Sequence, residues 1–111
     1  MTISEEPTAH FIAKKVADIP FNEHHIATIS VNGVLLCLYI FDENIYASRA
    51  ECPHAAFGLS GGYVDGKGYV VCPKHFYKFS LKSGLGPGAE GYRLKTYPVL
   101  KKATGIYVML P

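Results

Sequence analysis

Short apolar runs, separated at close intervals by turn residues, form the main pattern of this chain. Residues 11–16 have a mixed pattern, residues 25–31 alternate between apolar and polar side chains, and residues 34–41 form a continuous apolar run. Alternation indicates a half-buried strand, and a short continuous run bounded by turns indicates a buried one. The pattern therefore predicts three strands in the first part of the chain.

Turn residues connect the predicted strands into hairpins. The dipeptide Asn-Gly at positions 32–33 is a strong signal for a two-residue hairpin turn. Residues 42–44 form a second tight turn before a short strand at 45–48. Residues 63–71 predict a further hairpin, whose second strand leads directly to Cys72. The loops that hold Cys52 and Cys72 are therefore expected at the tips of neighbouring hairpins.

The remaining segments complete an all-β pattern. A glycine-rich segment at residues 84–91 precedes two closing strands, at 95–100 and 106–110. No long stretch shows a 3.6-residue period, so we expect little helix. Many short strands with Gly, Pro and Asn turns predict an antiparallel barrel or sandwich. We expect residues 1–9 to form a flexible tail and residues 10–111 to form one domain.

The composition is that of an ordinary globular domain with little net charge. Of the 111 residues, 49% are hydrophobic and 18% are charged, and the formal net charge is +2. This charge provides no basic stripe for nucleic acid, and the longest apolar run is far too short to span a membrane. We therefore expect no nucleic-acid or membrane partner, with a monomer as the default state.

Cysteine usage points to a reducing compartment. Cys37 lies inside the run at residues 34–41, where an unpaired thiol behaves as a small buried hydrophobe. The other two cysteines, Cys52 and Cys72, belong to metal-binding motifs, so no structural disulfide is expected. The first residues show neither the basic nor the apolar region of a secretory signal. Together these features predict a cytoplasmic location.

Two short loops carry the residues with metal-binding chemistry. The first holds Cys52 and His54 in a Cys-x-His pattern, and the second holds Cys72 and His75 in a Cys-x-x-His pattern. Two thiolates and two imidazoles suit either a tetrahedral zinc or a 2Fe-2S cluster. Zinc fingers usually keep like ligands together, whereas a mixed pair in each loop lets both loops reach both irons of a cluster. The spacing therefore favours the cluster, with a structural zinc site as the alternative.

The sequence around these four residues resembles the binding motif of Rieske 2Fe-2S proteins. The first loop, at about residues 49–62, ends in a Leu-Ser-x-Gly pattern similar to the first cluster loop of that family. The second loop, at about residues 72–79, ends in the aromatic Phe79 and is followed by a Ser-Gly turn where the family has Thr-Gly. The resemblance covers roughly residues 12 to 110.

This resemblance implies a fold, a cofactor and a ligand set. The implied fold is an antiparallel barrel or sandwich with a small inserted subdomain that binds one 2Fe-2S cluster per chain. Cys52 and Cys72 would ligate the inner iron, and His54 and His75 would ligate the outer iron. No catalytic residue is implied.

The implied function is that of a one-electron carrier between a reductase and a terminal oxygenase. The oxygenase itself also needs a mononuclear iron with two His and one carboxylate, and a chain of this length has no room for that domain. The chain is thus expected to be an electron-transfer component and not an enzyme. The alternative from the same resemblance is a cluster-bearing small subunit similar to that of nitrite reductase.

The residues beside the ligands predict a low reduction potential. High-potential members of the family carry an additional Cys in each loop, and this chain has Phe57 and Lys74 there. Tyr77 and Phe79 stand where those members have Ser and Tyr. Fewer hydrogen bonds to the cluster sulfurs leave the reduced state less stabilised. We expect a potential on the order of −150 mV, at the low end of the Rieske range.

Five further side chains have open roles. Phe76 and Tyr77 are bulky aromatics after the second ligand pair, and they form either a docking surface or a packed cover of the cluster. The adjacent His24 and His25 could bind a metal, but we expect them to be solvated, because neighbouring residues of a strand point to opposite faces. His10 has no assigned role.

Overall fold

The computed structural model describes residues 7–53, 58–74, 76–87 and 91–111. Within these ranges the chain forms ten strands and two 3₁₀ helices, with no α-helix. The strands are β1 (Thr8–Ala13), β2 (Ile26–Val31), β3 (Val34–Phe41), β4 (Asn44–Arg49), β5 (Tyr63–Val64), β6 (Tyr69–Val71), β7 (Lys78–Ser80), β8 (Thr96–Tyr97), β9 (Val99–Lys102) and β10 (Gly105–Leu110). The 3₁₀ helices are η1 (Val16–Asp18) and η2 (Leu59–Gly61). In the described ranges no helix is long and apolar enough to cross a membrane.

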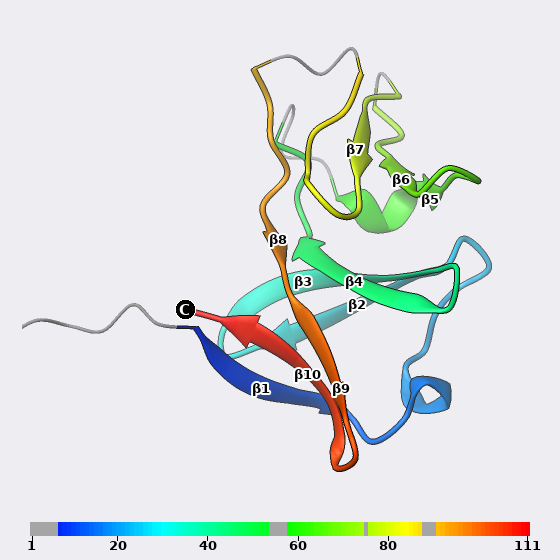
Figure 1. Ribbon diagram of the computed structural model, residues 1–111. Helices are drawn as coiled ribbons and strands as arrows, with labels where there is room; N and C mark the ends of the chain where they lie inside the picture. The colour runs from blue at the N-terminus through cyan, green and yellow to red at the C-terminus, as the bar shows by residue number, and fades with distance from the viewer. Residues whose placement is uncertain (1–6, 54–57, 75, 88–90) are drawn as a thin grey trace, which may run out of the picture.

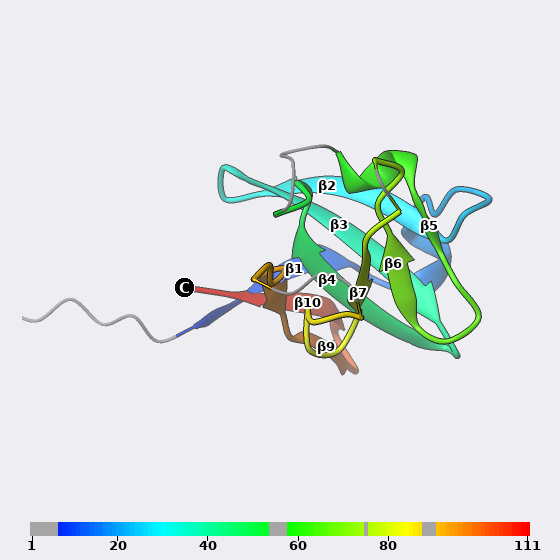
Figure 2. The same ribbon diagram turned by 90° about the horizontal axis from the view of Figure 1, so that it is seen from above.

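The strands form three antiparallel sheets. The orders are β1-β10-β9, β2-β3-β4-β8 and β5-β6-β7. The first two sheets make a base, and the small third sheet stands on the side of β2, β3 and β4 (Figure 1). Seen from above, β5, β6 and β7 lie over the β2-β3-β4 sheet (Figure 2). This arrangement confirms the expected all-β fold of short antiparallel strands.

Strand β3 is buried on both faces and separates two hydrophobic cores. Leu36 and Leu38 are fully buried in the core of the base, while Cys37 and Tyr39 are fully buried in the core beneath the small sheet. Successive side chains of a strand point to opposite faces, so a strand covered on both sides needs a continuous apolar run. This requirement explains why residues 34–41 do not alternate.

The two predicted hairpin turns on either side of β3 are confirmed. Asn32 and Gly33 have φ angles of 51° and 80°, and Asp42 and Glu43 have φ angles of 50° and 66°. Two consecutive positive φ angles are the signature of a type I′ turn, whose twist matches that of the paired strands. The second turn forms without glycine, and Asn44 supports it by donating a side-chain hydrogen bond to the Asp42 carbonyl at 3.1 Å.

The first strand differs from its prediction at both ends. Strand β1 begins at Thr8 and ends at Ala13, so the expected strand at residues 11–16 was placed too late, and the expected tail at residues 1–9 is too long. Thr8 pairs with Leu110 at the other end of the chain. Because this pairing is non-local, local composition does not reveal it. Residues 1–6 lie outside the described ranges.

Proline divides the predicted strand at residues 95–100. Strand β8 ends at Tyr97 and β9 begins at Val99, because Pro98 has no N–H to donate to a strand ladder. The Pro98 carbonyl accepts a hydrogen bond from the N–H of Met109 at 2.9 Å, which ties this break to β10.

The three histidines outside the motifs occupy two environments. His24 and His25 are exposed, as expected, but they lie in a turn and not on a strand. His10 is only half-exposed, and its Nε2 is buried without a hydrogen-bond partner. The pairing of β1 with β10 accounts for this partial burial of His10.

The turn between β5 and β6 is organised by Asp65, and it generates a stability prediction. The Asp65 carboxylate accepts hydrogen bonds from the N–H groups of Lys67 (2.8 Å) and Tyr69 (3.0 Å), and Lys78 Nζ lies 3.5 Å from it. Partial burial opposes ionisation, but these N–H groups and the ammonium lower the pKa of Asp65 overall. We expect Asp65→Ala to destabilise the protein by about 1 kcal/mol at pH 7. Asp65→Asn keeps an acceptor and should cost less.

The pH dependence follows from the lowered pKa. The contribution of Asp65 is present above its unfolded pKa of about 3.9 and is lost as pH falls through the folded value. Urea unfolding of wild type and Asp65→Ala should therefore show a constant difference from pH 8 to about 5 and a smaller one below about pH 4. If Asp65→Ala and Asp65→Asn destabilised the protein equally, the role of Asp65 as a hydrogen-bond acceptor would be contradicted.

Candidate metal centre

The first loop positions Cys52 directly after β4. Its two ends are tied together, because the N–H of Leu59 donates to the Ala50 carbonyl at 2.8 Å and Glu51 forms an isolated bridge with Gly58. Leu59 is fully buried under the loop. The loop is therefore anchored at both ends, and Cys52, at 1% exposure, lies at its buried start.

The second loop positions Cys72 directly after β6. The N–H of Cys72 donates to the Tyr77 carbonyl at 2.8 Å, which closes the loop just before β7. This loop is the tip of the β6–β7 hairpin, as expected. The first loop was also expected at a hairpin tip, and that prediction is wrong, because it joins β4 to η2 and is closed by a single bridge.

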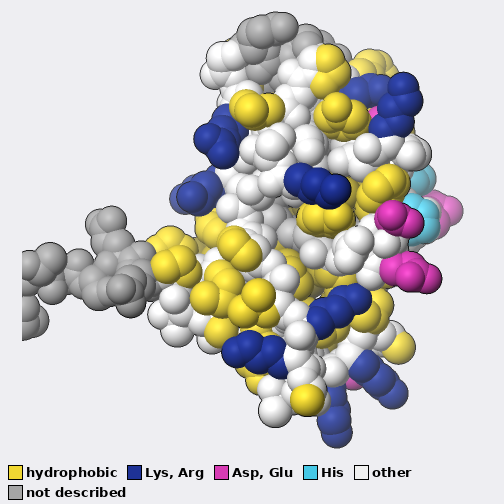
Figure 3. Space-filling model, viewed as in Figure 1, with side chains coloured by type: hydrophobic (Ala, Val, Ile, Leu, Met, Phe, Trp, Pro, Cys, Tyr) yellow, Lys and Arg dark blue, Asp and Glu magenta, His cyan; other side chains and the backbone are white. Residues whose placement is uncertain are grey.

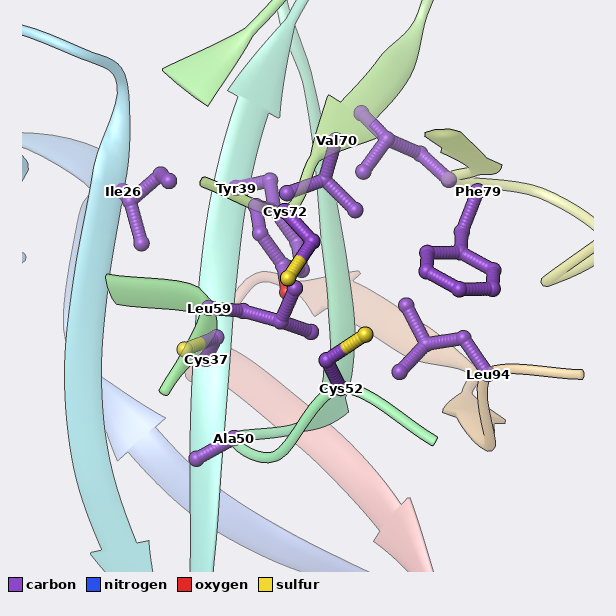
Figure 4. Close-up of a cluster of buried hydrophobic side chains, with 11 residues drawn as sticks. Ile26, Cys37, Tyr39, Ala50, Cys52, Leu59, Val70, Cys72, Phe79 and Leu94 are labelled. Carbon is purple, nitrogen blue, oxygen red and sulfur yellow. The ribbon is translucent and has the colours of Figure 1, made fainter. Parts of the chain in front are cut away.

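The two loops bring the thiols of Cys52 and Cys72 together in the hydrophobic core beneath the small sheet (Figure 4). The side chains of the two cysteines are hydrogen-bonded to each other, and neither they nor Cys37 forms a disulfide. Burial raises the pKa of the Cys72 thiol, the contact with Cys52 raises it further, and the N–H of Lys74 opposes both. Two facing, buried and unpaired thiols form half of a soft donor set.

This donor chemistry fits the expected iron-sulfur cluster as far as it is described. Two thiolates from two loops, with a backbone N–H directed at one sulfur, match the cysteine side of such a site. The other two expected ligands, His54 and His75, lie outside the described residues, as does Phe57. Among the residues that are described, no three metal-binding side chains come together.

A buried hydroxyl network beneath the first loop was not predicted from the sequence. The Ser48 hydroxyl donates to the Arg49 carbonyl at 2.8 Å, so the 2.7 Å bond between Tyr39 and Ser48 is donated by the Tyr39 hydroxyl. Burial, followed by the nearby Cys37 thiol, raises the pKa of Tyr39 well above its ordinary value. Tyr39 thus remains a neutral donor that fixes the end of β4. The available signal was a tyrosine inside the apolar run at residues 34–41.

The two aromatic residues after the second ligand pair have different environments. Phe76 is 69% exposed and has a positive φ of 57°, which is uncommon for a bulky residue. Tyr77 is half-buried against the core beneath the small sheet, and its ring centre lies 6.0 Å from that of Tyr92. The structure therefore supports the packing role for Tyr77 and leaves Phe76 available for contact.

Close packing at Gly62 links the two loops and provides a test. A Cβ at this position would overlap the carbonyl oxygen of Val71, one residue before Cys72. Because the Val71 carbonyl belongs to the backbone and cannot rotate away, Gly62→Ala must displace one loop relative to the other. We expect it to lower the free energy of unfolding by at least about 2 kcal/mol and to reduce the metal content. Urea unfolding and metal analysis would measure both effects.

Gly66 provides the matched control for Gly62. A Cβ at Gly66 meets no atom within 4 Å, and its φ is not positive. Gly66→Ala should leave metal content unchanged and be neutral or stabilise by up to about 1 kcal/mol. Similar losses in both variants would contradict the close-approach argument.

Comparison with known proteins identifies a domain family and its relatives. The model of the Rieske [2Fe-2S] domain matches residues 9–98. A ferredoxin component of naphthalene 1,2-dioxygenase/salicylate 5-hydroxylase systems from Ralstonia sp. is 34% identical over 94 residues, which cover 84% of this chain and 86% of the relative.

Solved structures give the same fold. A complex of reduced oxygenase and oxidised ferredoxin in carbazole 1,9a-dioxygenase contains a chain with a TM-score of 0.71 and 23% identity, covering 95% of this chain and 94% of that one. A protein described as the putative small subunit of an NADPH nitrite reductase has a TM-score of 0.73 and 27% identity, covering 91% of this chain and 97% of its own. With the matching domain model, the related ferredoxin and the facing thiols, this chain belongs to the Rieske [2Fe-2S] domain family.

Proposed function

We propose that this chain is a one-electron carrier that passes electrons from a reductase to a terminal oxygenase. The observation that carries the proposal is the meeting of two buried, unpaired thiols from two loops, in a chain whose relatives are named as ferredoxin components of dioxygenase systems. The chain acts as a component of an oxidoreductase system and not as the catalyst.

The proposed cofactor is one 2Fe-2S cluster per chain. Cys52 and Cys72 hold one iron as thiolates, and His54 and His75 hold the other as neutral imidazoles. When bound, the cluster supplies one reversible electron. Leu59 and the core beneath the small sheet exclude water from the Cys52 and Cys72 thiolates. The N–H of Lys74 stabilises negative charge on Cys72.

The proposed potential is at the low end of the Rieske range. Phe79 is fully buried and has no hydroxyl, and no disulfide joins the loops among the described residues. Both features leave fewer groups to stabilise the reduced state.

A second candidate is a cluster-bearing small subunit of a multicomponent reductase. The 27% identity to a putative nitrite reductase small subunit favours it. In that case the protein would purify in a stable complex with a large subunit, whereas a carrier would purify alone as a monomer. A structural zinc site is the remaining alternative, and a colourless zinc protein would identify it.

The domain and location are part of the proposal. We place one domain over residues 10–111, extended to Thr8 by the pairing of β1. The three unpaired cysteines support a cytoplasmic location.

The direct test is an EPR spectrum of the dithionite-reduced protein with a potential titration. We expect a rhombic signal with an average g value below that of all-Cys clusters, which titrates as one electron at about −150 mV. We expect this signal because the neutral histidine ligands would bind only one of the two irons and so make the two irons inequivalent. An EPR-silent, colourless protein would contradict the proposal.

Substitution of Cys72 and of Cys37 separates a proposed ligand from a core residue. Cys72→Ala should abolish the cluster, because it removes an iron ligand. Cys37→Ala removes a thiol that is equally buried in the same core, and we expect it to keep the cluster while destabilising the protein by about 1 kcal/mol. Iron content and the visible spectrum measure the outcome. Loss of the cluster in both variants, with folding intact, would contradict the assigned roles.

A further inference from the structure

The charges of this chain are divided unequally between its two parts. Residues 49–95, which include both loops, carry seven Lys and Arg against three Asp and Glu, a formal charge of +4. The rest of the chain carries four against six, a charge of −2. Two of those six acidic residues lie in residues 1–6, outside the described ranges, so the described residues of the rest of the chain carry no net charge. The small net charge of +2 therefore conceals a concentration of positive charge in residues 49–95, which we call the upper part.

Basic side chains surround the buried cysteines. Arg49, Arg93 and Lys95 line a depression of about 260 Å³, together with Cys52, Pro53 and one carboxylate, that of Glu51. Lys74 is exposed two residues after Cys72. Figure 3 shows Lys and Arg side chains on both sides of the upper part, whereas Asp and Glu side chains lie mostly along one edge lower down.

Within the described ranges, most of these basic groups form no ion pair. Of the seven, only Lys78 forms an ion pair with a carboxylate in the described part of the chain, with Asp65 at 3.5 Å. Arg93 donates only to the Ser83 carbonyl at 3.3 Å, and Lys95 lies over the ring of Tyr97 at 5.7 Å. Unpaired charges project a field into solvent, where a partner can meet it.

An apolar side chain is exposed on the same loop as Lys74. Phe76 follows it by two residues and is 69% exposed, and its positive φ holds it on the loop surface. An exposed aromatic beside a basic side chain is typical of a small interface with an apolar centre and a polar rim.

We propose that the cluster end of this protein docks onto an acidic redox protein, with Lys74, Arg49, Arg93 and Lys95 facing carboxylates and Phe76 at the centre. This inference rests on the proposed carrier function and names the chemistry of its partner. One electron passes from the reduced donor to this protein, and no bond is made or broken. A charge of +4 spread around an aromatic suits a protein surface better than nucleic acid, which needs a denser basic stripe.

The test uses a plant-type 2Fe-2S ferredoxin with an acidic surface as electron donor, because its potential of about −400 mV is low enough to reduce a Rieske centre. Stopped-flow rate constants are measured from low to high ionic strength. For the wild type we expect a rate constant that falls steeply with salt. Arg93→Glu/Lys95→Glu should lower it at least about 10-fold at low salt, and the difference should vanish at high salt, where the charges are screened.

The matched control reverses two lysines on the base. Lys14→Glu/Lys15→Glu changes the net charge by the same amount, and both side chains are exposed on the part of the chain outside the +4 region. We expect rates within about twofold of wild type, because local charge and not net charge steers docking. If Arg93→Glu/Lys95→Glu fails to fold, the milder Arg93→Gln/Lys95→Gln variant tests the same point.

Two further readouts separate this proposal from the carrier function. Binding of the oxidised protein to the oxidised donor, followed by biolayer interferometry, measures docking without electron transfer. The EPR signal and potential of each variant verify the cluster. If the cluster is intact but binding does not depend on salt, the proposal of an acidic partner is wrong and the carrier function is unaffected. The same conclusion follows if Arg93→Glu/Lys95→Glu and Lys14→Glu/Lys15→Glu have equal effects. Preferential binding to duplex DNA or phosphatidylserine vesicles would also overturn the proposal of an acidic partner, and absence of the cluster would instead overturn the carrier function.

Discussion

The structure depends on keeping two thiols from distant segments face to face inside a low-dielectric core. Burial raises the pKa of Cys72, so the protein opposes thiolate formation unless a cation is bound between the loops. Backbone contacts between described residues hold the ends of both loops. The hydrogen bond from Leu59 to Ala50 and the bridge between Glu51 and Gly58 close the first loop, and the hydrogen bond from Cys72 to Tyr77 closes the second.

Strand β3 transmits this constraint to the rest of the molecule. Its odd-numbered residues Cys37 and Tyr39 support the loops, and its even-numbered residues Leu36 and Leu38 complete the base. A substitution on one face of β3 therefore changes the packing of the core on that face. The packing of the opposite face keeps the strand backbone in place. The hydrogen bond from Tyr39 to Ser48 joins β3 to β4 just before Cys52, so the rigidity of the sheet extends to the first ligand.

Local chemistry allowed the sequence to predict the turns and β3, and the two cysteines of the predicted motif, Cys52 and Cys72, lie together in one buried core. The two turns beside β3 follow from residues that accept positive φ angles, and the motif follows from donor types at fixed spacing. The start of β1 could not be predicted, because it is decided by pairing with Leu110 at the opposite end of the chain. The positive φ of Phe76 likewise has no local signal, because it is imposed by closure of the loop between Cys72 and Tyr77.

The unpaired charges of the upper part are understandable from the energetics of a carrier. Pairing an exposed Arg or Lys with a neighbouring carboxylate stabilises a fold by only about 0 to 1 kcal/mol. Leaving it unpaired costs that small amount, while an oriented field can raise the rate of association by roughly 10- to 1,000-fold. A protein that must bind and leave two partners in turn benefits from fast association and gains little from tight binding, since tight binding slows release. Positive charge concentrated in the part of the chain that holds the loops, with no net charge on the described residues of the base, also orients the molecule before contact, so that the loops face an acidic partner.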